Sequence, residues 1–418
     1  VLINDRSTAE IYHNTVAGRQ EDIHFSSKMS TKPITIEEVL EPLTPQEKEE
    51  VQKEDFRIPL EFYLEGININ EQTTEEAREN AVTKVRQAAE KRVAISNEIK
   101  KNPDILKTPA ENPILIAGFH RCGTTLLHRL MENDKQFLCP KFWEMMEPLP
   151  PGRVENYQET ERYKKAKKEF EQTIYDVGIA KHEYSFELAD ECMTILQDYF
   201  LELPEITYVK TMTKWANFVF NCPKEHVQKA YQYYRQFLQC LFYKSIGPSQ
   251  RMLVKSAMHT LFMDTYKETF PDARYVLIYR NPCEMVPSLA SLAGDFAKRQ
   301  GYGDDKLGKR MAAYYSEATR CAIQFFKTLP EDKYLIIGYS EMVKDPMATV
   351  KKIYSKFNLK LTPEATESMQ RYLAENKQHK HGKHKYSLED FGLTENDIKE
   401  SLKDYIEYFK NGTEKMPI

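Results

Sequence analysis

From residue 113 onward, short and continuous apolar runs alternate with longer stretches whose apolar residues recur at helical spacing. Such runs are typical of strands that are buried on both faces of a parallel sheet. Four of them occupy residues 113–117, 252–254, 275–279 and 334–337. Helix-capable stretches follow them at residues 126–133, 260–269, 284–298 and 347–357. Strand followed by helix, repeated, predicts an α/β fold with a doubly wound parallel sheet over about residues 110–360.

Two other segments have purely helical patterns. Residues 1–108 read as a helical N-terminal arm or cap, in which 73–99 is rich in Glu, Ala, Arg and Lys. A long insertion at about 150–250 contains a charged helix over 157–172 and an aromatic helix over 230–242. Aromatic residues three and four apart form one face of a helix, so this face either packs in the core or lines an apolar acceptor pocket.

The composition narrows the possible partners. The formal net charge of the 418 residues is -4, which gives no overall positive field for nucleic acid. No apolar run approaches the roughly 18 residues of a membrane helix. The seven Cys form no CxxC pair, which favours reduced thiols and a cytoplasmic location. The chain begins at Val1 without an initiator Met, so a targeting segment could have been removed.

The loop after the first apolar run has the context of a phosphate-binding turn. Backbone N–H groups and the positive end of a helix dipole converge on an anion there. Compared with the pattern G-x-x-x-x-G-K-[ST], Gly118, Gly123 and Thr125 are in place, but Thr124 stands where a nucleoside triphosphatase has its Lys. The positive charge lies within the loop, as Arg121. This pattern favours transfer of an anionic group without an obligatory metal.

A second loop follows the apolar run at 275–279. Arg280 ends that run, Pro282 suits the first turn of a helix, and Ser288 lies further along the same helical stretch. An Arg at the end of a strand and a Ser on the following helix can clamp a second phosphate. Lys255 ends the preceding apolar run, and we expect it at the same edge because the carboxyl ends of parallel strands meet there.

These residues carry a resemblance to the sulfotransferases. Residues 113–127 resemble their 5′-phosphosulfate loop, and 275–282 with Ser288 look like their 3′-phosphate motif. The likeness is strongest to a branch common in bacteria, with patterns of the form GxxRTGTTLLH, WExxxPxPPP, KSPxHL, PSLASL and HxYxLxDFGL, and it covers about residues 110–410. Departures from these patterns are Cys122 for Thr, Ala257 for Pro and Asn281 for Asp.

The resemblance implies a P-loop-like sulfotransferase domain at 109–418, with 150–250 on the acceptor side. It also implies a donor, 3′-phosphoadenylyl sulfate (PAPS), a product, PAP, and no metal. The C-terminal segment 376–418 would close over the donor, although its basic run at 377–385 can also be a solvated face. The residues that would bind the donor are Arg121, Cys122, Gly123, Thr124, Thr125, Arg280, Ser288 and Lys383.

The candidate catalytic residues comprise one cation and three possible bases. Lys255 would neutralise charge on the leaving phosphate. Glu144 is the first candidate for the general base, since it follows the phosphate loop by an interval similar to that in sulfotransferases with a carboxylate base. His182 is the second candidate and His259 the third.

The resulting hypothesis is a PAPS-dependent sulfotransferase that acts on a hydroxyl of a small organic or lipid-like acceptor, such as a sterol or phenol. A carbohydrate sulfotransferase is the alternative within the same class. A P-loop kinase is disfavoured by Thr124, and a non-catalytic nucleotide-binding module by the presence of the catalytic groups. The acceptor, the choice between O- and N-sulfation and the oligomeric state are left open by the sequence.

Overall fold

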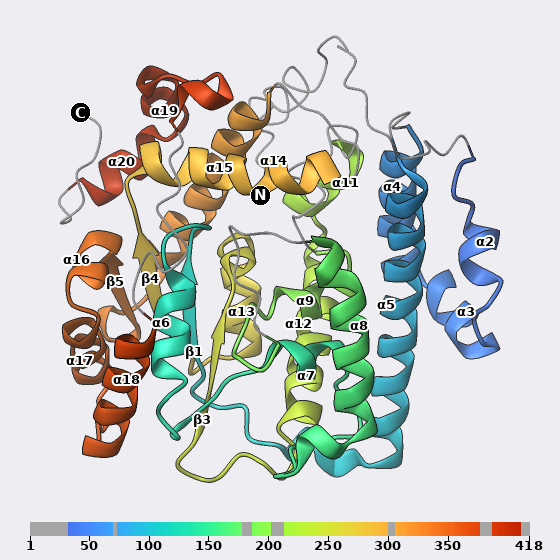
Figure 1. The fold of residues 1–418 in the computed structure, drawn as a ribbon, viewed down its shortest axis with the longest axis horizontal. Helices are drawn as coiled ribbons and strands as arrows, with labels where there is room; N and C mark the ends of the chain where they lie inside the picture. The colour runs from blue at the N-terminus through green and yellow to red at the C-terminus, as the bar shows by residue number, and fades with distance from the viewer. Residues whose placement is uncertain are drawn as a thin grey trace.

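The structure is a computed structural model, and it describes residues 32–69, 73–177, 186–201, 213–299, 306–376 and 387–410. Its centre is a five-stranded sheet in the order β2-β3-β1-β4-β5, and every strand pair is parallel (Figure 1). The strands are β1 (Ile114–Gly118), β2 (Phe137–Leu138), β3 (Arg251–Lys255), β4 (Arg274–Tyr279) and β5 (Tyr334–Gly338). The predicted α/β parallel fold is confirmed, and the four predicted apolar runs are β1, β3, β4 and β5.

Helices between the strands complete the α/β domain. Helix α6 packs on β1 and β3, and it contacts α17 and α18 in turn, while α15 packs on α14 and α13 (Figure 1). Their bounds are α6 (Thr124–Met131), α13 (Met263–Thr269), α14 (Pro282–Arg299), α15 (Leu307–Thr328), α16 (Tyr339–Lys344), α17 (Pro346–Lys356) and α18 (Pro363–Glu375). The 22-residue helix α15 is absent from the pattern read off the sequence.

A second group of helices stands beside the sheet, on the right of Figure 1. The N-terminal part contributes α2 (Ile36–Leu40), α3 (Pro45–Gln52), α4 (Glu54–Ile69) and α5 (Glu75–Lys101). The insertion contributes α7 (Phe142–Met146), α8 (Glu161–Val177), α9 (Met193–Gln197), α11 (Thr213–Phe220) and α12 (Lys224–Leu241). Tyr163 and Ala166 of α8 pack with Trp143 in a small cluster of their own. One large hydrophobic cluster runs from the other helices into the sheet, so the arm shares its core with the domain.

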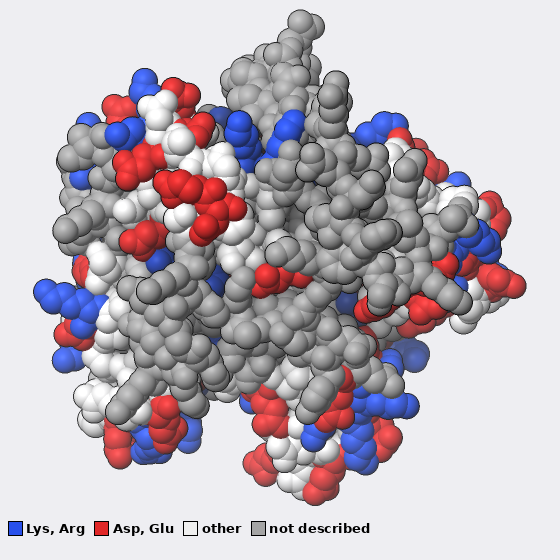
Figure 2. All heavy atoms as spheres, turned by 45° about the horizontal axis from the view of Figure 1, so that its top comes forward, with Lys and Arg blue, Asp and Glu red and all other residues white. Residues whose placement is uncertain are grey.

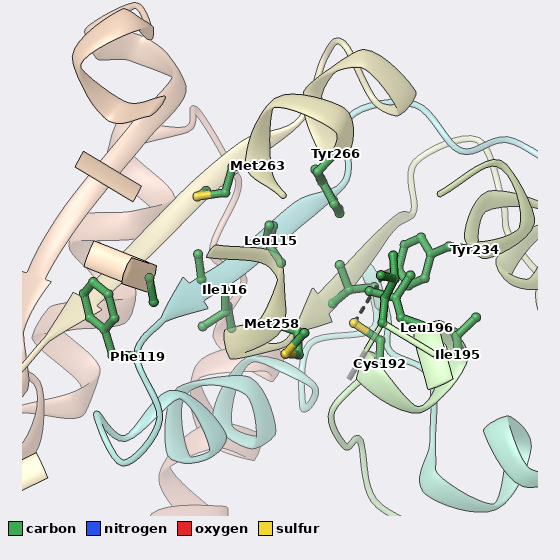
Figure 3. Packing of buried hydrophobic residues seen from close by; sticks show 14 of the residues in the cluster. Leu115, Ile116, Phe119, Cys192, Ile195, Leu196, Tyr234, Met258, Met263 and Tyr266 are labelled. Carbon is green, nitrogen blue, oxygen red and sulfur yellow. Dashed lines mark hydrogen bonds between the residues drawn. The ribbon is translucent and has the colours of Figure 1, made fainter. Parts of the chain in front are cut away.

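The aromatic face of α12 belongs to that core. Tyr234 and Phe237 are fully buried, and Figure 3 shows Tyr234 pointing toward Cys192 and Leu196. Figure 3 also shows Met258 between β1 and Cys192. The structure thus places this aromatic face in the hydrophobic core.

The C-terminal helices pack back on the sheet domain. A 3₁₀ turn, η5 (Glu389–Phe391), precedes α19 (Glu395–Ser401) and α20 (Lys403–Phe409), and all three contact neighbouring helices of the domain. Phe409 stacks on Tyr279 at the end of β4, with ring centroids 4.6 Å apart.

On the face shown in Figure 2, charged side chains of both signs are interspersed rather than gathered into one field. Among the residues that the structure describes, no helix is both long and apolar enough to cross a membrane.

Candidate functional site

The carboxyl ends of β1, β3 and β4 converge on one edge of the sheet, near the top of Figure 1. The loop from β1 turns tightly into α6 because of two glycines. Gly123 precedes α6 with a left-handed φ of 82°. A Cβ on Gly118 would lie 2.9 Å from Thr124 Cγ2 and 3.0 Å from the carbonyl oxygen of Ile278. Only glycine fits at these two positions, so the chain keeps a narrow turn with the first N–H groups of α6 at its mouth.

The two predicted phosphate loops contact each other. Arg121 Nε donates to Ser288 Oγ over 3.0 Å, and Arg280 Nη1 donates to the carbonyl oxygen of Arg121 over 3.0 Å. Arg280 also lies over the ring of Tyr339 and pairs with Glu284 at 2.7 Å. The structure thus brings together both cations that the sequence assigned to the two phosphates.

The C-terminal helix α20 reinforces this edge through a tyrosine. The Tyr405 hydroxyl accepts from the backbone N–H of Arg280 at 2.9 Å and donates to its carbonyl at 2.7 Å. Tyr405 also packs edge-on against Phe119 of the first loop. Lys383 and the basic run at 377–385 lie outside the described residues, so the closure predicted for them is untested.

The side chains of the other residues in the first loop differ in whether they are buried or reach neighbouring residues of the site. Cys122 is fully buried, and its thiol lies beside Met285 rather than at the loop surface. Its backbone N–H donates to the carbonyl oxygen of Phe119 over 3.3 Å, so Cys122 shapes the loop from within. Thr124 is also buried, whereas the hydroxyl of Thr125 reaches the end of β3.

Lys255 at the end of β3 is the most enclosed cation of the site. Its side chain is 0% exposed, and its ammonium donates to Thr125 Oγ1 over 3.2 Å and to Glu191 Oε1 over 2.9 Å. Asp190 lies further away, at 4.0 Å. A buried ammonium costs free energy unless it is paired, and Glu191 supplies that pairing next to the phosphate loop.

Glu144, the first candidate for the base, has several donors around its carboxylate. Arg153 donates to Oε1 and to Oε2, each over 2.6 Å, and the N–H of Lys141 donates to Oε2 over 2.9 Å. The side chain is 1% exposed. A bidentate pair of this kind occupies the lone pairs that a base would use.

The two histidine candidates differ in what the structure says of them. His259 is fully buried, with Nδ1 2.6 Å from the Tyr231 hydroxyl and Nε2 3.3 Å from the Cys192 thiol. Burial lowers the pKa of His259 to about 3. His182 lies outside the described residues. The roles of Glu144, His182 and His259 as the base stay predictions.

The structure also places two residues at this edge that the sequence reasoning did not select. Glu191 was not among the sequence-based candidates, and it proves to be the partner of Lys255. His120 lies directly before Arg121 in the first loop and was hidden among the variable positions of the motif. A polar residue at the carboxyl end of a strand was the available signal for His120.

The cations and hydrogen-bond donors at this edge suit a nucleotide with two phosphate-like groups. The glycine turn leads into the first N–H groups of α6, Lys255 bonds Thr125 beside them, and Arg121 bonds Ser288 next to Arg280. The described residues hold no group of three His, Cys, Asp or Glu side chains that could bind a metal ion.

The fold and these two loops are typical of an α/β enzyme that binds phosphate-like groups at the carboxyl edge of its sheet. Residues 113–363 match the model of the sulfotransferase family. The chain belongs to this family and is a transferase that moves sulfuryl groups.

Two relatives are the omega-hydroxy-beta-dihydromenaquinone-9 sulfotransferases Stf3 of Mycobacterium bovis and Mycobacterium tuberculosis. Each is 19% identical over 290 residues, which cover 68% of this chain and 73% of the relative. Two crystal structures share the fold. Sulfotransferase STF1 of Mycobacterium tuberculosis has a TM-score of 0.75 at 21% identity, covering 90% of this chain and 100% of that one. STF9 of Mycobacterium avium has a TM-score of 0.78 at 21% identity, covering 94% and 100%.

Proposed function

We propose that this sulfotransferase moves the sulfuryl group of PAPS to a hydroxyl of a small organic or lipid-like acceptor. The observation that carries the proposal is the position of Lys255, buried between the phosphate loop at Thr125 and the acceptor-side segment at Glu191. A cation there meets the charge that develops on the leaving phosphate when the sulfur–oxygen bond breaks.

The donor would be held by the two loops. The N–H groups of residues 123–125, with Arg121, would bind the 5′-phosphosulfate. Arg280 and Ser288 would bind the 3′-phosphate, for which a planar guanidinium is well suited. Because Arg280 also donates to the carbonyl of Arg121, occupation of the second subsite would rigidify the first.

A cavity of about 630 Å³ supports a bulky acceptor. It lies between α5, α7, α8 and α9, and its apolar lining includes Phe142, Met145, Met146 and Phe170. Thr194 lines it too and donates to the carbonyl of Glu191 over 3.4 Å, so the cavity begins one helical turn from the partner of Lys255. Its volume is within the range of small-molecule sites.

The relatives also support an apolar acceptor that carries a hydroxyl. The name of Stf3 gives it a hydroxylated menaquinone derivative as acceptor, which is an apolar body with a terminal hydroxyl. We propose the same chemical class here, a hydroxyl on an apolar body. A cytoplasmic location is also proposed, on the ground that all seven Cys are free thiols.

The test is ligand binding followed by turnover. PAP should raise the thermal unfolding temperature in the absence of Mg²⁺, and ATP with Mg²⁺ should raise it less. Incubation with labelled PAPS and a panel of sterols, phenols, isoprenoid alcohols, amines and sugars should label an apolar alcohol. Stabilisation by ATP with Mg²⁺ alone would contradict the sulfotransferase reaction, and labelling of sugars only would replace the proposed acceptor class.

A further inference from the structure

The imidazole of His120 is held in place by two neighbouring tyrosines of α15. Tyr315 Oη donates to the carbonyl oxygen of His120 over 2.9 Å, and Tyr314 Oη lies 3.0 Å from His120 Nδ1. Both tyrosines are buried. His120 is thus fixed at its backbone and at one ring nitrogen, while the following residue, Arg121, turns away to Ser288 with a positive φ of 64°.

The Tyr314 hydroxyl lies at Nδ1 of the ring, so Nε2 is the nitrogen on the opposite side. In the tautomer whose Nδ1–H donates to Tyr314 Oη, Nε2 has a free lone pair, as a base requires.

Burial keeps this ring neutral. It is the largest effect on the pKa of His120 and lowers that pKa below the ordinary value of 6.5. Lys255 and Arg121 lower the pKa further, and Glu191 opposes them. These interactions also place the ring within electrostatic reach of the two cations that flank the proposed donor subsite.

Access separates His120 from the other histidines that the structure describes. His128 and His259 are 0% exposed and His226 is 7% exposed, whereas His120 is only half-buried. A general base has to come within hydrogen-bond reach of the acceptor, so the three sealed rings are poorly placed for this task. Glu144 is occupied by Arg153.

We propose that His120 is the general base of the transfer, with Nε2 as the accepting atom and Tyr314 as the residue that fixes its tautomer. This inference rests on the proposed function. Nε2 takes the proton of the acceptor hydroxyl while the acceptor oxygen forms its bond to sulfur. The bond from sulfur to the bridging oxygen breaks, and the electron pair leaves with PAP, whose charge Lys255 offsets. The sulfate ester and PAP are released, and the imidazolium gives its proton to water.

The test compares His120→Ala with His226→Gln in the full chain. His226 is a matched control because burial lowers its pKa as well, but it lies on α12 and bonds the carbonyl of Tyr199. His120→Ala should lose about 10²–10⁴-fold in kcat, the range that a positioned base contributes. Its affinity for PAP, measured by calorimetry, should stay near that of the wild type. Added imidazole should restore part of the activity.

The pH profile supplies a readout that a structural role would not move. In the wild type, kcat/KM should fall as pH drops through a midpoint below 6.5, where His120 becomes protonated. This acid limb should vanish in His120→Ala and persist in His226→Gln. Tyr314→Phe should lower kcat with little change in the acceptor KM, because more of the neutral rings would then carry their proton on Nε2.

Two results would overturn the proposal. One is a kcat for His120→Ala within a few-fold of the wild type. The other is an acid limb that survives in His120→Ala but disappears in Glu191→Gln or Glu144→Gln. Failure of the proposed function would look different, because the wild-type protein would then neither bind PAP nor release it from PAPS.

Discussion

The ammonium nitrogen of Lys255 lies 2.9 Å from Glu191 Oε1 and 3.2 Å from Thr125 Oγ1. One buried cation therefore joins the phosphate loop of the sheet domain to the insertion that we propose as the acceptor side. The backbone repeats this connection, because the N–H of Cys192 donates to the carbonyl of Lys255 over 3.0 Å. The two halves of the proposed site are held in register at a single strand end.

Replacement of Lys255 should separate binding from chemistry. Lys255→Met should lower kcat by about 10²–10³-fold, since one preorganised donor at a developing charge contributes roughly that much. PAP affinity should fall far less, because Arg121 and Arg280 remain. Single-turnover rates and calorimetry measure the two effects. Lys267→Met, on the surface helix α13, is the control. Equal losses in PAP affinity and kcat would show that Lys255 acts in binding rather than in the transition state.

Arg280 should report on the 3′-phosphate. Arg280→Ala should weaken binding of adenosine 3′,5′-bisphosphate strongly and that of adenosine 5′-phosphate only slightly, as measured by calorimetry. Arg274→Ala is a matched control, because Arg274 begins the same strand at its opposite end and bonds the carbonyl of Phe357. If Arg280→Ala weakened the binding of both nucleotides by the same factor, other residues would bind the 3′-phosphate.

The parallel sheet was predictable because buried strands leave uninterrupted apolar runs. The four strands that were predicted differ from those runs by at most one residue at each end. The phosphate loop was predictable because glycines at fixed spacing are needed for its turn. The pairing of Lys255 with Glu191 was not, since these residues are far apart in sequence and meet only through the insertion. The contact at His120 Nδ1 was not predictable either, because its partner Tyr314 lies on α15, a helix that the hydrophobic pattern did not reveal.

The glycine at the start of α6 should be essential for the turn. A Cβ on Gly123 would lie 2.6 Å from Met342 Cε, and the residue has a left-handed φ of 82°. Gly123→Ala should therefore destabilise the protein by about 1–3 kcal/mol and weaken PAP binding. Denaturant unfolding and calorimetry test this prediction. Gly294→Ala, within α14 where a Cβ meets nothing closer than 3.4 Å, should be neutral or stabilising by about 0.5–1 kcal/mol. Unaltered stability and PAP affinity in Gly123→Ala would contradict the role given to this turn.

Filling the proposed acceptor cavity should affect the acceptor and not the donor. Thr194→Phe adds volume to the wall that is one helical turn from Glu191. The acceptor KM should rise severalfold while PAP affinity stays constant. Thr265→Phe, in a separate surface hollow beside α13, is the control for a general effect of added bulk. If both variants keep the wild-type acceptor KM, the acceptor binds outside this cavity.

The N-terminal arm should contribute to stability in a pH-dependent way. Arg92 of α5 is 3% exposed and pairs with Asp55 over 2.6 Å and with Glu50 over 2.7 Å. Burial alone would raise the pKa of Asp55, but the Arg92 and Lys229 charges outweigh it and leave that pKa lowered. A lowered pKa in the folded state means that the ionised carboxylate stabilises the fold above its unfolded pKa of about 3.9. That stability is lost as pH falls through the folded pKa.

Asp55→Asn should accordingly unfold at a lower temperature than the wild type at neutral pH, and the difference should shrink as pH drops below about 4. Thermal unfolding of both proteins at a series of pH values measures this difference in unfolding temperature. Asp104→Asn is the control, because Asp104 pairs with Lys107 on the open surface, where both side chains are more than half exposed. Such surface pairs contribute little to stability. A difference for Asp55→Asn that did not change with pH would mean that its carboxylate acts through shape or hydrogen bonding and not through its charge.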